Sequence, residues 1–340
     1  MMKQWIVQGK KGIDSLELQE VPIPSPEDYE VLVKFHAASL NYRDIVIANG
    51  KYVWTAIVPG SDAAGEVVKA GPKVTRFSVG QRVSPIFHLK HLYGSFDESY
   101  FPTSLGAKHD GVFRQYAVYN EESCVEIPSN LSYREAATLP CAAVTAWNTL
   151  YGGPRKLKPG ETVLVQGTGG VSIFALQFAK MGGAQVIATT SGPEKADRLK
   201  VERADHIINY KEDLKWGETA KKLSHRGRGA DFIIEIGGAN TMAQSAQAAA
   251  VDCQVSVIGN RAGPREENGH IGESHGTTMF TTRRILVGSR QLNEEMNTAI
   301  EVNDVKPIID AKTFRLSELK EAYTYSETGQ HFGKVVLDID

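Results

Sequence analysis

Short apolar segments separated by turn residues fill the first third of the chain, up to about Val125. Typical segments are EVLVKFHAASL, AAGEVVKAG and GQRVSPI, each bounded by glycine, proline or polar residues. This pattern predicts a β-rich domain with hairpins and a partial barrel. The stretch 88–111 is polar and irregular, and predicts a long loop.

From about Ser132 to Asn293, strand-like and helix-like segments alternate. TVLVQ precedes a helical pattern that runs to Lys180, and AQVIATTS precedes the helical pattern GPEKADRLKVER. Further strand-like segments are HIINY, ADFIIEIGG, CQVSVIG and RRILVGSR. Such alternation predicts βαβ units and an α/β fold with a doubly wound parallel sheet. The C-terminal segment returns to one helix and a final strand.

A glycine-rich stretch joins the first strand of this region to its helix. In VLVQGTGGVSIFALQFAK, Gly167 and Gly169 fill two positions of the dinucleotide fingerprint G-x-G-x-x-G, and Ser172 fills the third. The third glycine only brings helix and strand close together, so a serine there blocks no phosphate. A purely structural glycine turn is the alternative. We expect a nucleotide to bind at Gly167, Thr168, Gly169, Gly170 and Val171.

The end of the second strand bears on which nucleotide is bound. An NAD site usually has Asp or Glu about 20 residues beyond the glycines, but TTSGPEK has no carboxylate before Glu194. Ser191 and Lys195 offer a hydroxyl and a cation to a 2′-phosphate, and Tyr210 offers a phenol. These residues favour NADP(H). The alternative is a solvated Lys195 and a Tyr210 at the edge of the core.

The segment VSVIG ends a later strand of the same region. The carboxyl ends of parallel strands face the ligand crevice of such a sheet. We therefore expect Ile258 and Gly259 to present backbone groups to the carboxamide of the cofactor.

Composition and charge narrow the range of partners. The 340 residues are 23% charged and 41% hydrophobic, which is ordinary for a globular protein of about two domains. A net charge of -2 gives no reason to expect nucleic acid or an anionic membrane as a partner. No apolar run approaches the roughly 20 residues of a membrane span, and the first residues lack a signal-peptide core. Three widely spaced cysteines predict a reducing compartment, most simply the cytoplasm.

Several spaced motifs resemble a known family over nearly the whole chain. They are SLNYRD, VPGSDAAGEVVKAGPKVTRFSVGQRV, LPCAAVTAW, VLVQGTGGVS and FGKVV. The chain resembles the medium-chain dehydrogenase/reductase superfamily, on its quinone oxidoreductase and zinc-type alcohol-dehydrogenase-like side. The resemblance implies a GroES-like catalytic domain in residues 1–130, a Rossmann domain in 131–293 and a return to the catalytic domain in 294–340. It also implies a homodimer paired through the edge of the Rossmann sheet.

The zinc ligands of that superfamily are missing at the matching positions. Asn41 stands in place of a cysteine, Ser61 and Asp62 in place of a histidine and its neighbour, and Cys141 at the third place. Since catalytic zinc needs about three protein ligands, we expect no metal here and a core thiol at Cys141.

The superfamily's structural zinc lobe would lie between residues 83 and 112, where this chain has no cysteine. His88, His91 and His109 in that segment form only a weak metal candidate. A loop that covers the substrate is the preferred interpretation.

The resemblance also implies roles for residues in the catalytic domain. Tyr52 matches a tyrosine that donates a hydrogen bond to the reacting oxygen, with Tyr42 as the competing candidate. Asn41 matches an asparagine that binds the nicotinamide ribose or that oxygen. Thr145 and Lys334 match residues near the cofactor. The alternatives are a Tyr52 that covers apolar surface, a turn-stabilising Asn41 and a surface Lys334.

Without zinc, the implied chemistry is hydride transfer from NADPH to a quinone or to the C=C bond of an α,β-unsaturated carbonyl compound. A zinc-free alcohol or aldehyde dehydrogenase is the second possibility. A protein that binds the cofactor with little turnover is the third.

Overall fold

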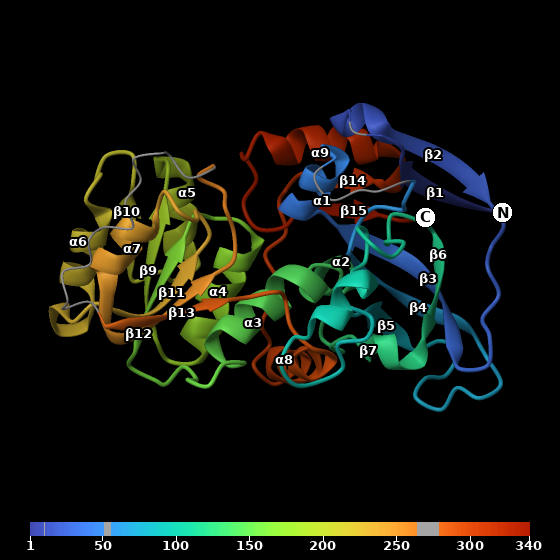
Figure 1. Ribbon diagram of the computed structural model, residues 1–340, viewed down its shortest axis with the longest axis horizontal. Coiled ribbons are helices and arrows are strands. Elements are labelled where there is room, and N and C mark those ends of the chain that lie inside the picture. The colour runs from blue at the N-terminus through green and yellow to red at the C-terminus, as the bar shows by residue number, and fades with distance from the viewer. Residues whose placement is uncertain (10, 51–55, 264–278) are drawn as a thin grey trace. The chain divides into compact units, whose positions relative to one another are not determined.

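The computed structural model describes residues 1–9, 11–50, 56–263 and 279–340. It divides into two compact units (Figure 1). Unit 1 comprises Met1–Val144 and Val287–Asp340, and unit 2 comprises Thr145–Leu286. The sequence predicts domain boundaries at 130/131 and 293/294, whereas the chain passes between the two units at 144/145 and 286/287. Unit 1 is therefore discontinuous in sequence, whereas unit 2 is one continuous segment.

Unit 1 is built on a mostly antiparallel sheet in the order β14-β15-β3-β4-β5-β7, with β6 also paired to β3. The long strand β3 (Glu30–Ser39) pairs with β4 (Asp62–Ala70) and with the C-terminal β15 (Val336–Asp338). A separate hairpin-like sheet pairs the first two strands. The β-rich first domain is thus confirmed. The remaining strands of this unit are β1 (Met2–Val7), β2 (Leu16–Val21), β5 (Arg82–Pro85), β6 (Tyr116–Asn120), β7 (Cys124–Glu126) and β14 (Phe314–Arg315).

The core of unit 1 is closed by aromatic side chains from distant segments. Phe35, Phe113 and Tyr323 are fully buried in one cluster. Gly111 lies so close to another segment that an added Cβ would sit 2.0 Å from the carbonyl oxygen of Gly60. The helices of this unit are α1 (Tyr42–Ala48), α2 (Tyr133–Ala136), α8 (Arg290–Val302) and α9 (Leu319–Glu327).

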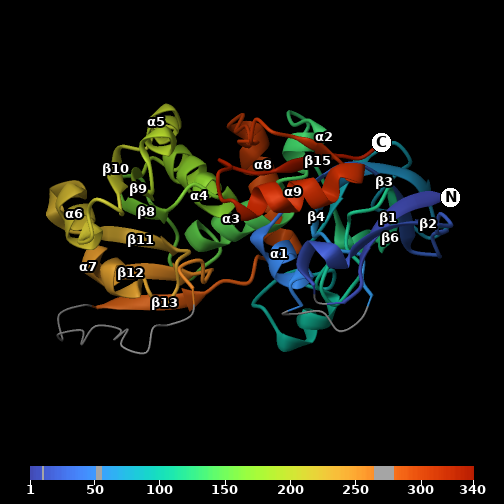
Figure 2. The same ribbon diagram turned by 90° about the horizontal axis from the view of Figure 1, so that it is seen from above.

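Unit 2 contains a six-stranded sheet in the order β10-β9-β8-β11-β12-β13, in which every neighbouring pair is parallel. The first strand, β8, is buried along its whole length, as expected for a strand covered on both faces. Figures 1 and 2 show α4 and α5 on one face and α6 and α7 on the other. The predicted doubly wound α/β fold is confirmed. The strands are β8 (Thr162–Gln166), β9 (Gln185–Thr190), β10 (His206–Asn209), β11 (Ala230–Glu235), β12 (Ala249–Val257) and β13 (Phe280–Arg284). The helices are α3 (Val144–Leu150), α4 (Gly170–Met181), α5 (Pro193–Val201), α6 (Trp216–Leu223) and α7 (Met242–Ala248).

The last strand of this sheet begins earlier than its sequence pattern predicts. RRILVGSR was expected to be the strand, but β13 ends at Arg284. Its partner β12 ends at Val257, whose carbonyl accepts the N–H of Ile285, so no ladder remains for the next residues. Val287 takes a φ of 57° and Ser289 caps α8. The alternating apolar residues after Arg284 are therefore buried without forming a strand.

No helix within the described ranges is both long and apolar enough to cross a membrane. The longest helix of the described residues, α8, is 13 residues long, and a membrane span needs roughly 20.

Candidate functional site

The glycine loop of unit 2 leaves open space above the carboxyl end of β8. Gly167 has a φ of 74°, a conformation that side chains rarely adopt, and its N–H bonds the carbonyl of Thr189 at 2.9 Å. A Cβ added at Gly167 or Gly169 would meet no atom within 4 Å. The fingerprint glycines therefore keep a cradle free for a ligand group.

Helix α4 begins directly after this loop, at Gly170, and no side chain caps it. Its first N–H groups have no partner within the helix, and they lie at the positive end of the helix dipole. A phosphate in the cradle would accept hydrogen bonds from this end. The hydroxyl of Ser172 donates to the carbonyl of Gln166 at 2.6 Å, so the residue at the third glycine position fastens the helix to the strand.

The predicted 2′-phosphate residues follow the paired ends of β9 and β10. The N–H of Tyr210 bonds the carbonyl of Thr190 at 3.1 Å, so Tyr210 and Ser191 both follow this paired end. Lys195 lies in the first turn of α5, and both Ser191 and Lys195 are half-buried. The N-cap residue of that helix is Gly192, where an added Cβ would again meet open space. This end of unit 2 therefore fits an anionic ligand.

The remaining cofactor candidates of unit 2 lie at two other places. Ile258 and Gly259 follow β12, and the N–H of Ile258 bonds the carbonyl of Glu235 at 2.9 Å. Their position at a strand carboxyl end is the one expected. Thr145 is buried in α3.

In unit 1, a buried polar cluster joins three distant segments. The ammonium of Lys334 donates to the carbonyl of Leu40 at 2.7 Å, to Oδ1 of Asn41 at 2.6 Å and to Oδ2 of Asp62 at 3.2 Å. The side chain of Lys334 is 3% exposed and that of Asp62 is 0% exposed. The interpretation of Lys334 as a surface lysine is therefore wrong.

Burial raises the pKa of the Asp62 carboxyl, and the charge of Lys334 opposes this shift. Oδ1 of Asp62 has no hydrogen-bond partner among the described residues. The neighbouring Asp44 is also fully buried, and burial raises its pKa to about 6. Lys334 is thus the cation that pairs with the buried carboxylate of Asp62, which also accepts the hydroxyl of Ser39 at 3.3 Å.

The orientation of the Asn41 amide follows from this cluster. Because an ammonium group only donates, the amide atom that faces Lys334 must be the oxygen. The Nδ2 group lies 3.4 Å from the hydroxyl of Ser61. Asn41 is therefore held with its donor end turned away from Lys334.

The residues at the zinc-ligand positions of unit 1 do not fit a zinc ion. The Lys334 ammonium already lies between Asn41 and Asp62. Burial raises the pKa of the Cys141 thiol well above its usual range, which disfavours the thiolate that zinc requires. In the described part of the chain, no group of three or more His, Cys, Asp or Glu residues could hold a metal ion.

The segment 88–111 is organised by aromatic contacts. His88 and His91 are buried, and their rings lie 4.9 and 5.6 Å from the ring of Phe96, measured between centroids. Burial lowers the pKa of His88 to about 3. These histidines therefore pack as neutral rings.

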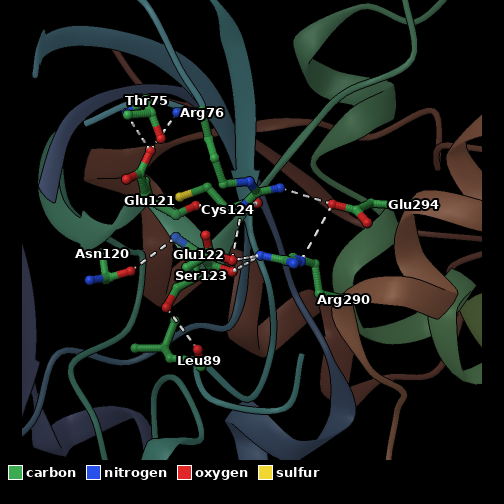
Figure 3. Close-up of polar contacts among 10 residues, drawn as sticks. All are labelled: Thr75, Arg76, Leu89, Asn120, Glu121, Glu122, Ser123, Cys124, Arg290 and Glu294. Atoms are coloured by element: carbon green, nitrogen blue, oxygen red, sulfur yellow. Dashed lines mark hydrogen bonds and ion pairs between the residues drawn. The ribbon is translucent and has the colours of Figure 1, made fainter. Parts of the chain in front are cut away.

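A polar network fixes the start of this segment (Figure 3). The hydroxyl of Ser123 donates to the carbonyl of Leu89 at 2.7 Å. Arg290 forms an ion pair with Glu122, and its backbone N–H bonds the carbonyl of His91 at 2.9 Å. Arg76 extends the network through the carboxylate of Glu294 at 3.0 Å and the carbonyls of Glu121 and Cys124.

Tyr52 and Tyr42 are the two candidate hydrogen-bond donors to the reacting oxygen. Tyr52 lies outside the described residues, so its role stays a prediction. Tyr42 is the first residue of α1 and is 47% exposed.

Two buried polar residues of unit 2, Gln166 and Glu235, are not among the residues predicted from the sequence. Each is the polar last residue of an apolar strand. Gln166 directly precedes Gly167, and Glu235 lies two residues before Gly237. That position is itself unusual for a buried amide and a buried carboxylate. It could have identified both residues.

Comparison with known proteins covers both units. Residues 27–129 match the alcohol dehydrogenase GroES-like domain, and residues 170–304 match the zinc-binding dehydrogenase family. The chain is 42% identical to a zinc-type alcohol dehydrogenase-like protein of Schizosaccharomyces pombe, over 97% of this chain and 96% of that protein. It is 30% identical to the acryloyl-coenzyme A reductase of Metallosphaera sedula, over 99% of each.

A crystal structure described as an alcohol dehydrogenase from Sinorhizobium meliloti is 37% identical and superposes with a TM-score of 0.90, covering 99% of this chain and 98% of that one. The similarity extends over the GroES-like and the Rossmann parts together. The chain therefore belongs to the medium-chain dehydrogenase/reductase superfamily and is an oxidoreductase of that superfamily.

Proposed function

We propose that this protein is a zinc-independent, NADPH-dependent reductase whose substrate is a quinone or an α,β-unsaturated carbonyl compound. One observation carries the proposal: an open glycine cradle is followed by Ser191 and Lys195 at the end of β9, with no carboxylate before the exposed Glu194. A carboxylate there would favour NAD, whereas a hydroxyl and a cation suit a 2′-phosphate. The acryloyl-coenzyme A reductase relative supports the substrate class, because acryloyl-coenzyme A is itself an α,β-unsaturated carbonyl compound.

The residues of unit 2 divide the binding of the cofactor among them. The cradle of Gly167, Gly169 and the first turn of α4 would hold the pyrophosphate. Ser191, Lys195 and Tyr210 would hold the 2′-phosphate. When bound, the cofactor would supply the hydride.

The cluster in unit 1 would support the reacting end of the substrate. Lys334 holds Oδ1 of Asn41 at 2.6 Å, so Nδ2 is the end of this amide that would donate to a substrate oxygen, in exchange for its 3.4 Å contact with the Ser61 hydroxyl. A donated hydrogen bond stabilises negative charge on a substrate oxygen after hydride addition. Since Lys334 fills the space between Asn41 and Asp62, we propose that this role needs no zinc.

The function is tested by steady-state NADPH oxidation with a panel of quinones, enones and aldehydes, with and without a chelator. We expect turnover with a quinone or an enone that the chelator does not change. Turnover of aldehydes alone would favour a zinc-free alcohol or aldehyde dehydrogenase. Tight NADPH binding without turnover would favour a cofactor-binding protein, and loss of activity with the chelator would contradict zinc independence.

The cofactor preference is tested by the double variant Ser191→Ala with Lys195→Ala. We expect it to weaken NADPH binding by about 1.5–3 kcal/mol, because a charge-assisted contact to the 2′-phosphate is lost. NADH, which lacks that phosphate, should bind almost unchanged. Titration of both cofactors by fluorescence measures the difference. Equal losses for both, or a wild-type preference for NADH, would show that these residues do not select the phosphate.

We also propose that the protein is a homodimer that pairs through β13. This strand pairs with β12 at the end of the six-stranded order, so its other edge has no strand partner among the described residues. An open edge is commonly covered by a second copy across a two-fold axis. Light scattering at micromolar concentration should give about twice the mass of one chain, which is 37.2 kDa. A monomeric mass would contradict this assembly.

We propose a cytoplasmic location. None of Cys124, Cys141 and Cys253 forms a disulfide, and Cys124 and Cys253 are buried. Free thiols without any disulfide are typical of a reducing compartment.

A further inference from the structure

Two buried polar side chains meet beneath the glycine loop of unit 2. Gln166 ends β8 and is 8% exposed, and Glu235 ends β11 and is 0% exposed. Nε2 of Gln166 donates to Oε2 of Glu235 at 2.8 Å. A buried amide paired with a buried carboxylate is costly unless the surrounding groups complete their hydrogen bonds.

The amide of Gln166 uses both of its ends. Oε1 accepts the backbone N–H groups of Ile236 at 3.0 Å and Gly237 at 3.1 Å. Nε2 donates to Glu235 and also to the hydroxyl of Ser245 at 2.9 Å. Because backbone N–H groups only donate, the orientation of this amide is unambiguous.

The carboxylate of Glu235 is held by donors alone. Oε1 accepts the N–H of Gly238 at 2.9 Å and the hydroxyl of Thr241 at 2.5 Å. Oε2 accepts from Gln166 and from Ser245. None of the ion pairs formed by the described residues includes Glu235. The network therefore depends on hydrogen-bond geometry rather than on a counter-charge.

The location of the pair in the sheet is decisive. β8 and β11 are neighbours, and chain order reverses between them: β9 and β10 extend to one side, β12 and β13 to the other (Figure 1). Ligands of open α/β sheets bind outside the carboxyl ends of the strands at this reversal. Gln166 and Glu235 bridge the two strands at that point.

The same pair connects the segments that would contact the cofactor. Gln166 directly precedes Gly167, and its carbonyl accepts the hydroxyl of Ser172 in α4. The carbonyl of Glu235 accepts the N–H of Ile258 at 2.9 Å. The glycine loop and the end of β12 thus take their positions from one buried network.

We propose that Gln166 and Glu235 are positioning residues of the cofactor site, which hold the glycine loop and the 258–259 backbone in binding geometry without touching the substrate. This proposal rests on cofactor binding at the glycine loop, as proposed above. It predicts that breaking the network weakens the binding of NADPH and NADH alike, because both share the pyrophosphate and the nicotinamide.

Gln166→Met tests this with little change of volume. We expect its Kd for both cofactors to rise between about ten- and a hundred-fold, the loss in affinity that is typical at metal sites when a residue that hydrogen-bonds the contacting groups is removed. At saturating cofactor, kcat should stay within about three-fold of the wild type. Fluorescence titration, steady-state kinetics and thermal unfolding are measured on the same preparations.

Gln254→Met is the matched control. Gln254 is a buried glutamine of the neighbouring β12, 3% exposed, and its Nε2 donates to the carbonyl of Thr149 at 2.9 Å. It lies within the strand and makes none of the contacts described for the pair. This variant should lose a similar amount of thermal stability but keep the wild-type Kd.

If Gln166→Met does not fold, the isosteric variant Glu235→Gln is measured in its place. This change keeps the shape of the side chain but replaces one accepting carboxylate oxygen by an NH2 group, which then faces the other hydrogen-bond donors of the network. A rise in Kd for both cofactors that Gln254→Met does not share supports the proposal. Equal Kd values in the wild type and in either network variant would overturn it, as would an equal rise in the control. If the wild type binds neither cofactor, the proposed function fails instead.

Discussion

Replacing Lys334 by methionine is expected to lower the free energy of unfolding by about 3–5 kcal/mol, the usual cost of leaving one partner of a buried ion pair alone. The ammonium bonds three groups in unit 1, and Asp62 would keep only the donors Asn41 and Ser39. Chemical denaturation at pH 7 measures the loss.

The loss should depend on pH in a defined direction. Burial raises the pKa of Asp62, so ionisation of this carboxyl opposes folding, and without Lys334 the pKa should rise further. The stability of the variant should therefore fall as pH rises from the unfolded pKa of Asp, about 3.9, through the raised folded pKa. Near pH 4 its deficit against the wild type should be smaller than at pH 7.

The double variant Lys334→Met with Asp62→Asn is the control. Removing both charges leaves no isolated buried carboxylate, so much of the lost stability should return. If the single variant loses less than about 1 kcal/mol of unfolding free energy, or if the double variant recovers none of the loss, the ion pair of Lys334 and Asp62 does not stabilise the fold as proposed.

The variant Tyr52→Phe is expected to lower kcat with an enone substrate by about 10²–10⁴-fold, the range typical of general-acid assistance. The substitution keeps the ring and removes only the hydroxyl. An unperturbed tyrosine has a pKa near 10, so it acts as a donor at neutral pH. The affinity for the cofactor should barely change. The fall in kcat should be smaller with a quinone than with an enone, because the oxygen of a reduced quinone is less basic than that of an enolate.

Tyr42→Phe is the matched control for this measurement, since Tyr42 is the competing candidate at the start of α1. If Tyr42→Phe is the damaging change and Tyr52→Phe is near wild type on every enone, the donor is Tyr42. If neither matters, the proton comes from solvent and the site acts by positioning alone.

The sequence predicted the elements whose pattern is local. The strand β8, the glycine loop and α4 follow from one stretch of apolar and glycine positions, because turn, helix start and phosphate cradle are adjacent in the chain. The motif positions of Asn41 and Lys334 also followed from local resemblance. Their mutual contact did not, since 293 residues separate them and only the fold brings them together.

The same limit explains the residues that pattern alone could not place. The end of β13 depends on where its partner β12 ends, and the residues RRILVGSR alone do not indicate that position. Gln166 and Glu235 lie 69 residues apart, and their pairing depends on the neighbouring positions of β8 and β11. Local pattern thus predicts elements, whereas the partners of buried polar groups follow from topology.

The discontinuity of unit 1 has a consequence for how the chain is made. β3 emerges early from the ribosome, but its partner β15 and the cation for Asp62, Lys334, are made about 300 residues later. At about 5–20 residues per second, some 300 residues of further synthesis leave that edge of β3 without β15 for roughly 15–60 seconds. Unit 2 is continuous and ends at Leu286, 48 residues before Lys334, so it is complete about 2–10 seconds earlier. A nascent chain of this protein should therefore complete its second unit before its first, and the β15 edge of β3 should stay open to wrong pairing until residues 336–338 have been made.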